Sequence, residues 1–169
     1  RVIHHHTRQG DQAKDAEEPH VQAEQRMSAD CADRNLLGFA NWMNMQAREE
    51  VEHAMRFYNF VLERGGRVEL HAIDKPPTEY GSPLEIMQKS LEHERFVTAR
   101  INALYDQAQQ ENDRAAQVML QWFITEQVEE EASIDDIVQR MRMFGEEGTV
   151  LFMLDRELGA REPEEEDEE

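Results

Sequence analysis

Residues 38–66, GFANWMNMQAREEVEHAMRFYNFVLERGG, decide the fold. Apolar side chains recur in this stretch every three or four positions, which is the period of an amphipathic helix. The glycine pair that closes the stretch is a typical helix end. The pattern therefore predicts one long helix over residues 38–64.

Three more helices are predicted downstream. Ser82-Pro83-Leu84-Glu85 combines a capping serine, a proline in the first turn and a glutamate at the third position, so a helix is expected over 83–110. Asn112 or Asp113 caps the next helix, which runs to Phe144. A short last helix covers Thr149 to Leu158.

The stretch between the first two predicted helices, residues 67–82, has prolines and no helical period and is expected to be a loop. A helix of about 27 residues is roughly 40 Å long, and about sixteen extended residues reach up to about 53 Å. Helix hairpins need only short connections. This loop is therefore long enough to cross the length of a bundle and set two long helices parallel.

Composition restricts the class of function. The chain has 169 residues, with Lys plus Arg 18 against Asp plus Glu 37 and a formal net charge of -19. This charge argues against nucleic acid and anionic membrane surfaces as partners and suits binding of cations. Without 18 consecutive apolar residues, no membrane-spanning helix is expected. The only cysteine, Cys31, excludes a disulfide framework and a cysteine-based zinc site, so a reducing, cytoplasmic setting is expected.

The chain divides into three parts by pattern. Residues 1–26 are atypical, since apolar residues are sparse there and Pro19 interrupts any helix across it. Residues 27–160 contain the predicted helices and form one domain. Residues 161–169 are nearly all acidic and are expected to be a solvated tail.

Acidic residues stand on the apolar stripe of each long helix, where leucines would be expected. They are Glu50, with His53 beside it and Glu49 at the edge, in the helix over 38–64; Glu94 in the helix over 83–110; and Glu126 and Glu129, with Glu130 at the rim, in the helix over 113–144. Desolvating an ion costs several kcal/mol, and like charges add to that cost. Several such acids would consume the roughly 5–15 kcal/mol by which a domain is stable.

A positive charge must therefore lie among these acids. The main basic residues near the stripes, Arg95 and Arg140, are too few to balance them, whereas bound metal ions can. Glu50 and His53 are three residues apart and share a helix face, so together they can hold one ion while the second carboxylate oxygen reaches another. Oxygen ligands with one imidazole favour iron or manganese over a metal selected by thiolates.

The motifs together resemble the non-haem ferritins of bacteria and archaea. They are Gly38 to Met43, Gln46 to Ala54, Glu63 to Val68, Glu92-His93-Glu94 and Leu120 to Glu131, within a resemblance that covers about residues 27–160. The resemblance implies an all-α, ferritin-like four-helix bundle, with the long crossover between the second and third helices and a short fifth helix. It also implies a homo-oligomeric shell of 24 subunits that stores iron.

The resemblance further implies a ferroxidase, which oxidises Fe(II) with O2 or H2O2 at a di-iron centre and deposits a ferric mineral inside the shell. By motif position, Glu50 matches the bridging carboxylate, His53 a ligand of the first iron, and Glu94 and Glu130 ligands of the second. A third iron site is implied at Glu49, Glu126, Glu129 and Glu130, and Gln127 matches a polar residue near the second iron.

Two features separate the chain from related families. Bacterioferritins and rubrerythrins carry a second Glu-x-x-His, where this chain has Gln127 and Glu130. The haem-ligating methionine of bacterioferritins is replaced by Glu52, so no haem is expected.

The chain departs from the family pattern in the region of the first helix. Glu17 stands where the resemblance implies a further iron ligand, but its surroundings lack the family motif, and Glu24 stands where a tyrosine is expected. An alternative function is therefore a ferritin-like structural shell with impaired or absent ferroxidase activity. A mini-ferritin that protects DNA fits less well, because the chain is acidic and its acids lie inside the bundle.

Overall fold

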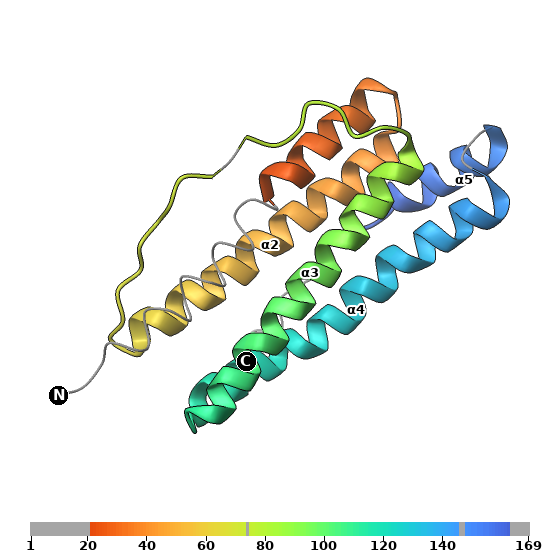
Figure 1. Ribbon diagram of the computed structural model, residues 1–169. Coiled ribbons are helices and arrows are strands. Elements are labelled where there is room, and N and C mark those ends of the chain that lie inside the picture. Colours follow the sequence, from red (N-terminus) through yellow and green to blue (C-terminus); the bar gives the residue numbers. More distant parts are fainter. Residues whose placement is uncertain (1–20, 74, 146–147, 163–169) are drawn as a thin grey trace.

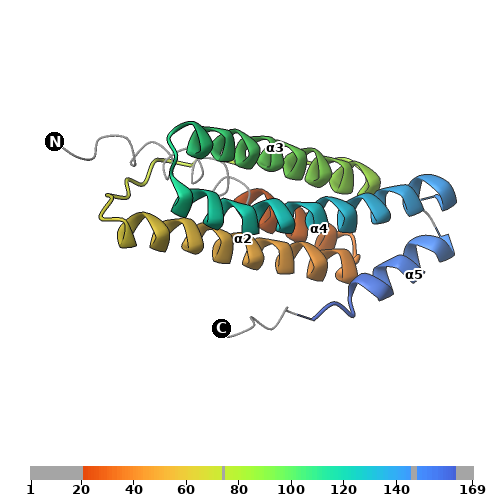
Figure 2. The same ribbon diagram turned by 90° about the horizontal axis from the view of Figure 1, so that it is seen from below.

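The computed structural model describes residues 21–73, 75–145 and 148–162, which form helices and the segments that connect them and contain no strand. The helices are residues 21–33, α2 (Leu37–Glu63), α3 (Pro83–Gln110), α4 (Arg114–Phe144) and α5 (Gly148–Leu158). The helix over 21–33 packs with α2, α3 and α4 as a bundle, and α5 lies at one end of it, beside the start of α2 (Figures 1 and 2). This is the predicted four-helix bundle with a short last helix. The described helices all lack the combination of length and hydrophobicity that a bilayer crossing requires.

The helix ends follow the local sequence signals. The Ser82 hydroxyl accepts from the Glu85 amide at 3.3 Å, and the Glu85 carboxylate accepts from the Ser82 amide at 2.7 Å, which completes a capping box. The Asp113 carboxylate accepts from the Ala116 amide at 3.1 Å. Gly65 takes a positive φ of 72° just after α2, where a side chain would be strained. The predicted helix bounds are confirmed to within one residue.

The crossover between α2 and α3 runs back along the length of α2, so these two helices point in the same direction (Figure 1). Its described residues form neither helix nor strand. Arg26 donates to the Thr78 carbonyl at 2.6 Å, and Lys89 donates to the Tyr80 carbonyl at 2.9 Å. These two bonds fix the crossover to the helix over 21–33 and to α3. The crossover connects parallel helices, as its length predicted.

The last helix docks onto the start of α2. One carboxylate oxygen of Asp155, in α5, accepts from the backbone amides of Gly38 at 2.8 Å and Phe39 at 3.1 Å. Leu36, the residue that precedes α2, makes no side-chain capping bond, so α5 supplies the cap that the local sequence lacks. A Cβ at Gly38 would lie 1.6 Å from the Asp155 carbonyl oxygen. The glycine is therefore required by the close approach of the two helices.

The apolar core is divided into two clusters. The α5-side cluster consists mainly of Met27, Cys31, Phe39, Trp42, Met43, Ile86, Met87, Leu91, Ile134, Ile137, Val138, Met141 and Leu154. The distal cluster consists of Phe57, Val97, Ile101, Leu104, Ala108, Ala116, Leu120 and Phe123. The division falls between residues 43 and 57 of α2, 91 and 97 of α3, and 123 and 134 of α4. These are the segments that carry the predicted metal ligands.

The first described helix differs from the sequence expectation. The boundary predicted at residue 26 does not appear, because residues 21–33 form one helix. Glu24, Met27 and Cys31 lie on one face of it and are 5% exposed or less. One of these three inward positions, Glu24, holds a carboxylate, so the sequence shows no regular apolar period there. Glu17 lies outside the described residues.

Candidate metal centre

A layer of buried polar side chains separates the two apolar clusters. Its members on α2, α3 and α4 are 6% exposed or less and comprise Gln46, Glu50, His53, Glu94, Gln127 and Glu130. The prediction that acids and one histidine interrupt the apolar stripes is thereby confirmed for Glu50, His53 and Glu94. Their role as metal ligands stays a prediction.

The stripe predicted for the helix over 113–144 is wrong in its orientation. Val118 and Trp122, which the helical period places on the same face as Glu126 and Glu129, are 72% and 36% exposed, whereas Leu120 and Phe123 are buried. Apolar residues occupy both faces of α4, so periodicity alone could not select the face that turns inward.

The burial of the acids on α4 therefore also differs from the prediction. Glu130, predicted at the rim, is buried, and so is Gln127. Glu126 is half-buried, and Glu129, predicted in the middle of the stripe, is exposed. The burial expected for Glu129 is therefore wrong for the same reason as the stripe.

His53, Glu126 and Glu130 form the tightest potential metal site in the described residues. One ligand atom from each lies within 4.8 Å of the other two. The His53 Nδ1 lies 3.6 Å from a carboxylate oxygen of Glu50. Glu50 is 1% exposed, and neither of its carboxylate oxygens accepts a hydrogen bond from the described residues. A buried carboxylate without donors is suited to a cation, so these residues fit a metal ion.

Aromatic rings fix the His53 imidazole. Trp122 and Phe123 meet it edge-on, with ring centroids 5.4 Å and 5.7 Å away. The Arg56 guanidinium covers the Trp122 ring at 3.8 Å from its centroid. These contacts hold the imidazole against the carboxylates and keep that side of the site apolar.

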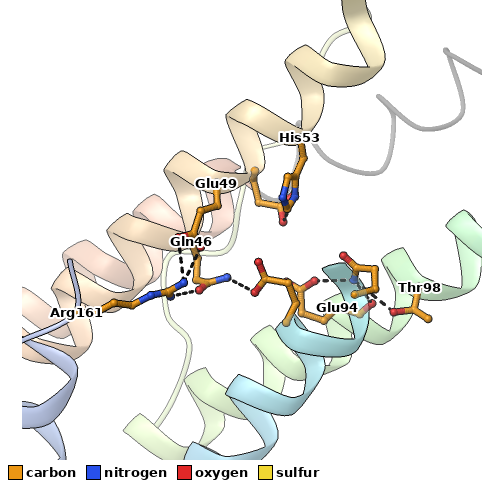
Figure 3. A network of polar contacts seen from close by, with 9 residues as sticks. Gln46, Glu49, His53, Glu94, Thr98 and Arg161 are labelled. Atoms are coloured by element: carbon orange, nitrogen blue, oxygen red, sulfur yellow. Dashed lines mark hydrogen bonds and ion pairs between the residues drawn. The ribbon is translucent and has the colours of Figure 1, made fainter. Parts of the chain in front are cut away.

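Two glutamines orient the two deeper carboxylates (Figure 3). The Gln46 amide nitrogen donates to Glu130 Oε2 at 2.7 Å. The Gln127 amide nitrogen donates to Glu94 Oε2 at 3.0 Å and lies 3.3 Å from Thr98 Oγ1. Each carboxylate is thus held from one side by the side-chain amide of a glutamine.

The layer holds more negative charge than the basic groups around it neutralise. Burial, followed by the charge of Glu94 and then those of Glu49 and Glu50, raises the pKa of Glu130 to about 8, and the hydrogen bond from Gln46 lowers it only in part. The acids therefore cannot all be ionised at neutral pH unless positive charge is added. A divalent cation supplies that charge, and a set of carboxylates with one imidazole suits a hard or borderline metal.

The two arginines expected near the stripes do not reach this layer. Arg140 pairs with Glu157 at 2.6 Å near the end of the bundle. Arg95 lies 3.8 Å from Glu131 on the surface. Neither guanidinium can neutralise the buried acids.

Two residues that contact the layer were not predicted from the sequence. Gln46 lies four residues before Glu50, and this helical spacing could have identified it. Arg161, predicted as the start of the acidic tail, instead donates to both carboxylate oxygens of Glu49, at 2.8 Å and 3.0 Å. No sequence signal identifies Arg161, because its place depends on how α5 docks.

Known proteins share this sequence pattern. A family model described as a ferritin-like domain matches residues 24–144. A bacterial non-heme ferritin of Bacteroides fragilis (strain 638R) is 42% identical over 124 residues, which cover 73% of this chain and 77% of that protein. A bacterial non-heme ferritin of Staphylococcus aureus (strain USA300) is 36% identical over 140 residues, 83% of this chain and 84% of that protein.

Solved structures share the fold. An open-pore ferritin from the hyperthermophilic archaeon Archaeoglobus fulgidus aligns with a TM-score of 0.91 and 42% identity, over 95% of this chain and 98% of that chain. A closed form of the same organism's ferritin, engineered by mutagenesis, aligns with a TM-score of 0.92 and 41% identity, over 97% of this chain and 100% of that chain. These similarities confirm the resemblance drawn from the motifs.

Proposed function

The chain belongs to the non-haem ferritins of bacteria and archaea, and on this premise we propose that it stores iron by oxidising Fe(II) and depositing a ferric mineral. The oxidation takes place at a dinuclear ferroxidase centre inside the bundle, and the mineral forms inside a shell of 24 subunits. Iron is the substrate, and O2 or H2O2 is the oxidant.

The observation that carries this proposal is the buried carboxylate and imidazole layer. Glu50 is 1% exposed without a hydrogen-bond donor to either oxygen, and burial together with the charge of Glu94 raises the pKa of Glu130 to about 8. An arrangement of this kind in the middle of a bundle weakens the fold unless a cation fills it. Two Fe(II) ions supply the positive charge that this layer of acids lacks.

Each residue has a distinct role in this mechanism. Glu50 bridges the two iron ions, a role that its motif position implies and that its two buried oxygens without a hydrogen-bond donor support. His53 completes the first iron's ligands, and Glu94 and Glu130 hold the second. Each Fe(II) loses one electron to the oxidant, and the carboxylates favour the product because they stabilise the higher charge of Fe(III). Glu126, which groups with His53 and Glu130, extends the site toward the surface.

The charge of the chain supports the uptake of iron. A net charge of -19 per chain raises the local concentration of cations and their rate of arrival, an effect that weakens with salt.

Exposed apolar side chains support assembly into a homo-oligomer. Those on the surface of the single chain include Leu37, Val51, Met55, Phe96, Val118, Val128, Phe144 and Phe152. Contacts between subunits would bury these side chains, as contiguous apolar surface is buried at protein–protein contacts. A shell of 24 chains of 19.8 kDa would have a mass of roughly 475 kDa, and a native mass near 20 kDa would refute it.

Stopped-flow oxidation of Fe(II) tests the catalytic part of the proposal. Glu50→Ala removes the bridging carboxylate, so the initial rate should fall by about 10-fold or more, in line with the loss of a positioned catalytic group. Glu52→Ala changes an exposed glutamate two residues away and serves as the matched control. Equal initial rates for the wild type and Glu50→Ala would refute the ferroxidase. They would favour the structural shell that the altered sequence around Glu17 suggests.

A further inference from the structure

Arg161 connects the end of α5 to the candidate metal centre. The backbone carbonyl of Arg161 accepts from the Asn41 side-chain amide at 3.2 Å, as does that of Leu158 at 3.4 Å. These bonds fix the chain just after α5 against the side of α2. The Arg161 side chain points from there toward the polar layer (Figure 3).

The guanidinium of Arg161 binds two residues of α2 at once. One terminal nitrogen, Nη2, donates to both carboxylate oxygens of Glu49, at 3.0 Å and 2.8 Å, and the other, Nη1, donates to the side-chain oxygen Oε1 of Gln46. The guanidinium carbon lies 5.4 Å from the Trp42 ring centroid. The side chains of Arg161 and Glu49 are 22% and 15% exposed. A charge-assisted pair that is partly shielded from water is stronger than a fully exposed one.

The same contact determines how Glu130 is held. An arginine can only donate hydrogen bonds, so the Gln46 amide must turn its oxygen toward Arg161 and its nitrogen toward Glu130. The Gln46 nitrogen then donates to Glu130 Oε2 at 2.7 Å. Arg161 therefore acts on the metal centre through Gln46 as well as on Glu49.

The residues of the implied third iron site are not assembled for a metal ion in this arrangement. Glu49 is bound by the guanidinium at both oxygens. Glu129 is exposed, and Glu126 groups instead with His53 and Glu130. A permanent cation from the protein thus stands at the carboxylate where a third metal ion would be expected.

We propose that Arg161 acts as a built-in cation that occupies the place of the third metal ion. The inference rests on the proposed function, since it assumes that two metal ions bind in the layer beside it. A metal ion reaches Glu49 only after the guanidinium has moved away. The wild-type chain therefore holds metal at the two inner positions and not at Glu49.

The test compares two replacements of similar length that differ in charge. Arg161→Gln removes the positive charge, and Arg161→Lys keeps it. Both preserve the docking of α5, because that docking uses the Asp155 carboxylate and the backbone carbonyl of residue 161. Arg156→Ala, an exposed change in the last turn of α5, is the matched control.

Zn(II) is the probe, because it does not undergo oxidation. The number of Zn(II) ions per chain is measured by equilibrium dialysis of the assembled protein, and their positions by anomalous scattering from crystals. Arg161→Gln should bind about one more ion per chain than the wild type, with new anomalous density at Glu49. Arg161→Lys and Arg156→Ala should match the wild type.

Anomalous density at Glu49 in the wild type would overturn the proposal, as would equal binding by the wild type and Arg161→Gln. A double variant, Arg161→Gln with Glu49→Gln, should lose the additional ion, and its retention would also overturn it. Failure of the proposed function is seen separately, as an absence of zinc at His53 and Glu130. In that case new density at Glu49 in Arg161→Gln would still support the role of Arg161.

Discussion

Asp155→Ala should weaken the contact through which α5 caps α2. The Asp155 carboxylate is the side-chain acceptor for the Gly38 and Phe39 amides, at 2.8 Å and 3.1 Å. Leu36 offers no replacement, because it makes no capping bond. Phe39 is 0% exposed, so water cannot easily replace the lost acceptor at its amide.

The magnitude follows from these two bonds. Loss of a capping side chain typically costs about 0.5–2 kcal/mol, and a buried donor left without an acceptor costs about 1–3 kcal/mol. The two losses share one acceptor and are not fully additive, so the free energy of unfolding should fall by about 2 kcal/mol. For a chain of this size the midpoint of thermal unfolding should fall by roughly 4–8 °C.

Urea unfolding followed by circular dichroism, at matched chain concentration because assembly adds stability, measures the change. Asp155→Asn keeps an oxygen acceptor and should lose about half as much. Asp106→Ala removes an exposed aspartate of α3 and should leave the midpoint unchanged. The capping argument fails if Asp155→Ala unfolds at the same urea concentration as Asp106→Ala.

Three further outcomes are expected. Gly38→Ala should destabilise the chain by about 3 kcal/mol, since its Cβ would lie 1.6 Å from the Asp155 carbonyl oxygen; a wild-type melting temperature would contradict the close approach. Cys31 should resist a thiol reagent at pH 8 until the chain is unfolded, because burial, and then the charge of Asp30, raises its pKa to about 12; rapid labelling of the native protein would show otherwise. The pKa of Glu130 is about 8 in the folded protein and about 4.5 in the unfolded chain. Between these two pH values the folded state therefore holds a proton that the unfolded state releases. The stability of the metal-free protein should therefore fall as pH rises from about 5 to 8, and Zn(II) should remove that fall; a flat metal-free profile in urea titrations would rule this out.

The sequence by itself determined the four helices α2 to α5, most of their ends and the chemistry of the layer. The Ser82 capping box, the Asp113 cap and the glycines after α2 act through neighbouring atoms, so their effect can be predicted without the fold. The positions of Glu50 and His53 on the α2 stripe follow from the period of one helix. Burial of these charges then favours a bound cation whatever the neighbouring helices are.

Only the tertiary structure decided which groups meet across helices. The face of α4 that turns inward depends on packing, because Val118 and Leu120 are both apolar and only one of them is buried. Packing thereby placed Glu126 with His53 and left Glu129 on the surface. The place of Arg161 depends on a contact between segments more than a hundred residues apart, and no local interaction encodes such a contact.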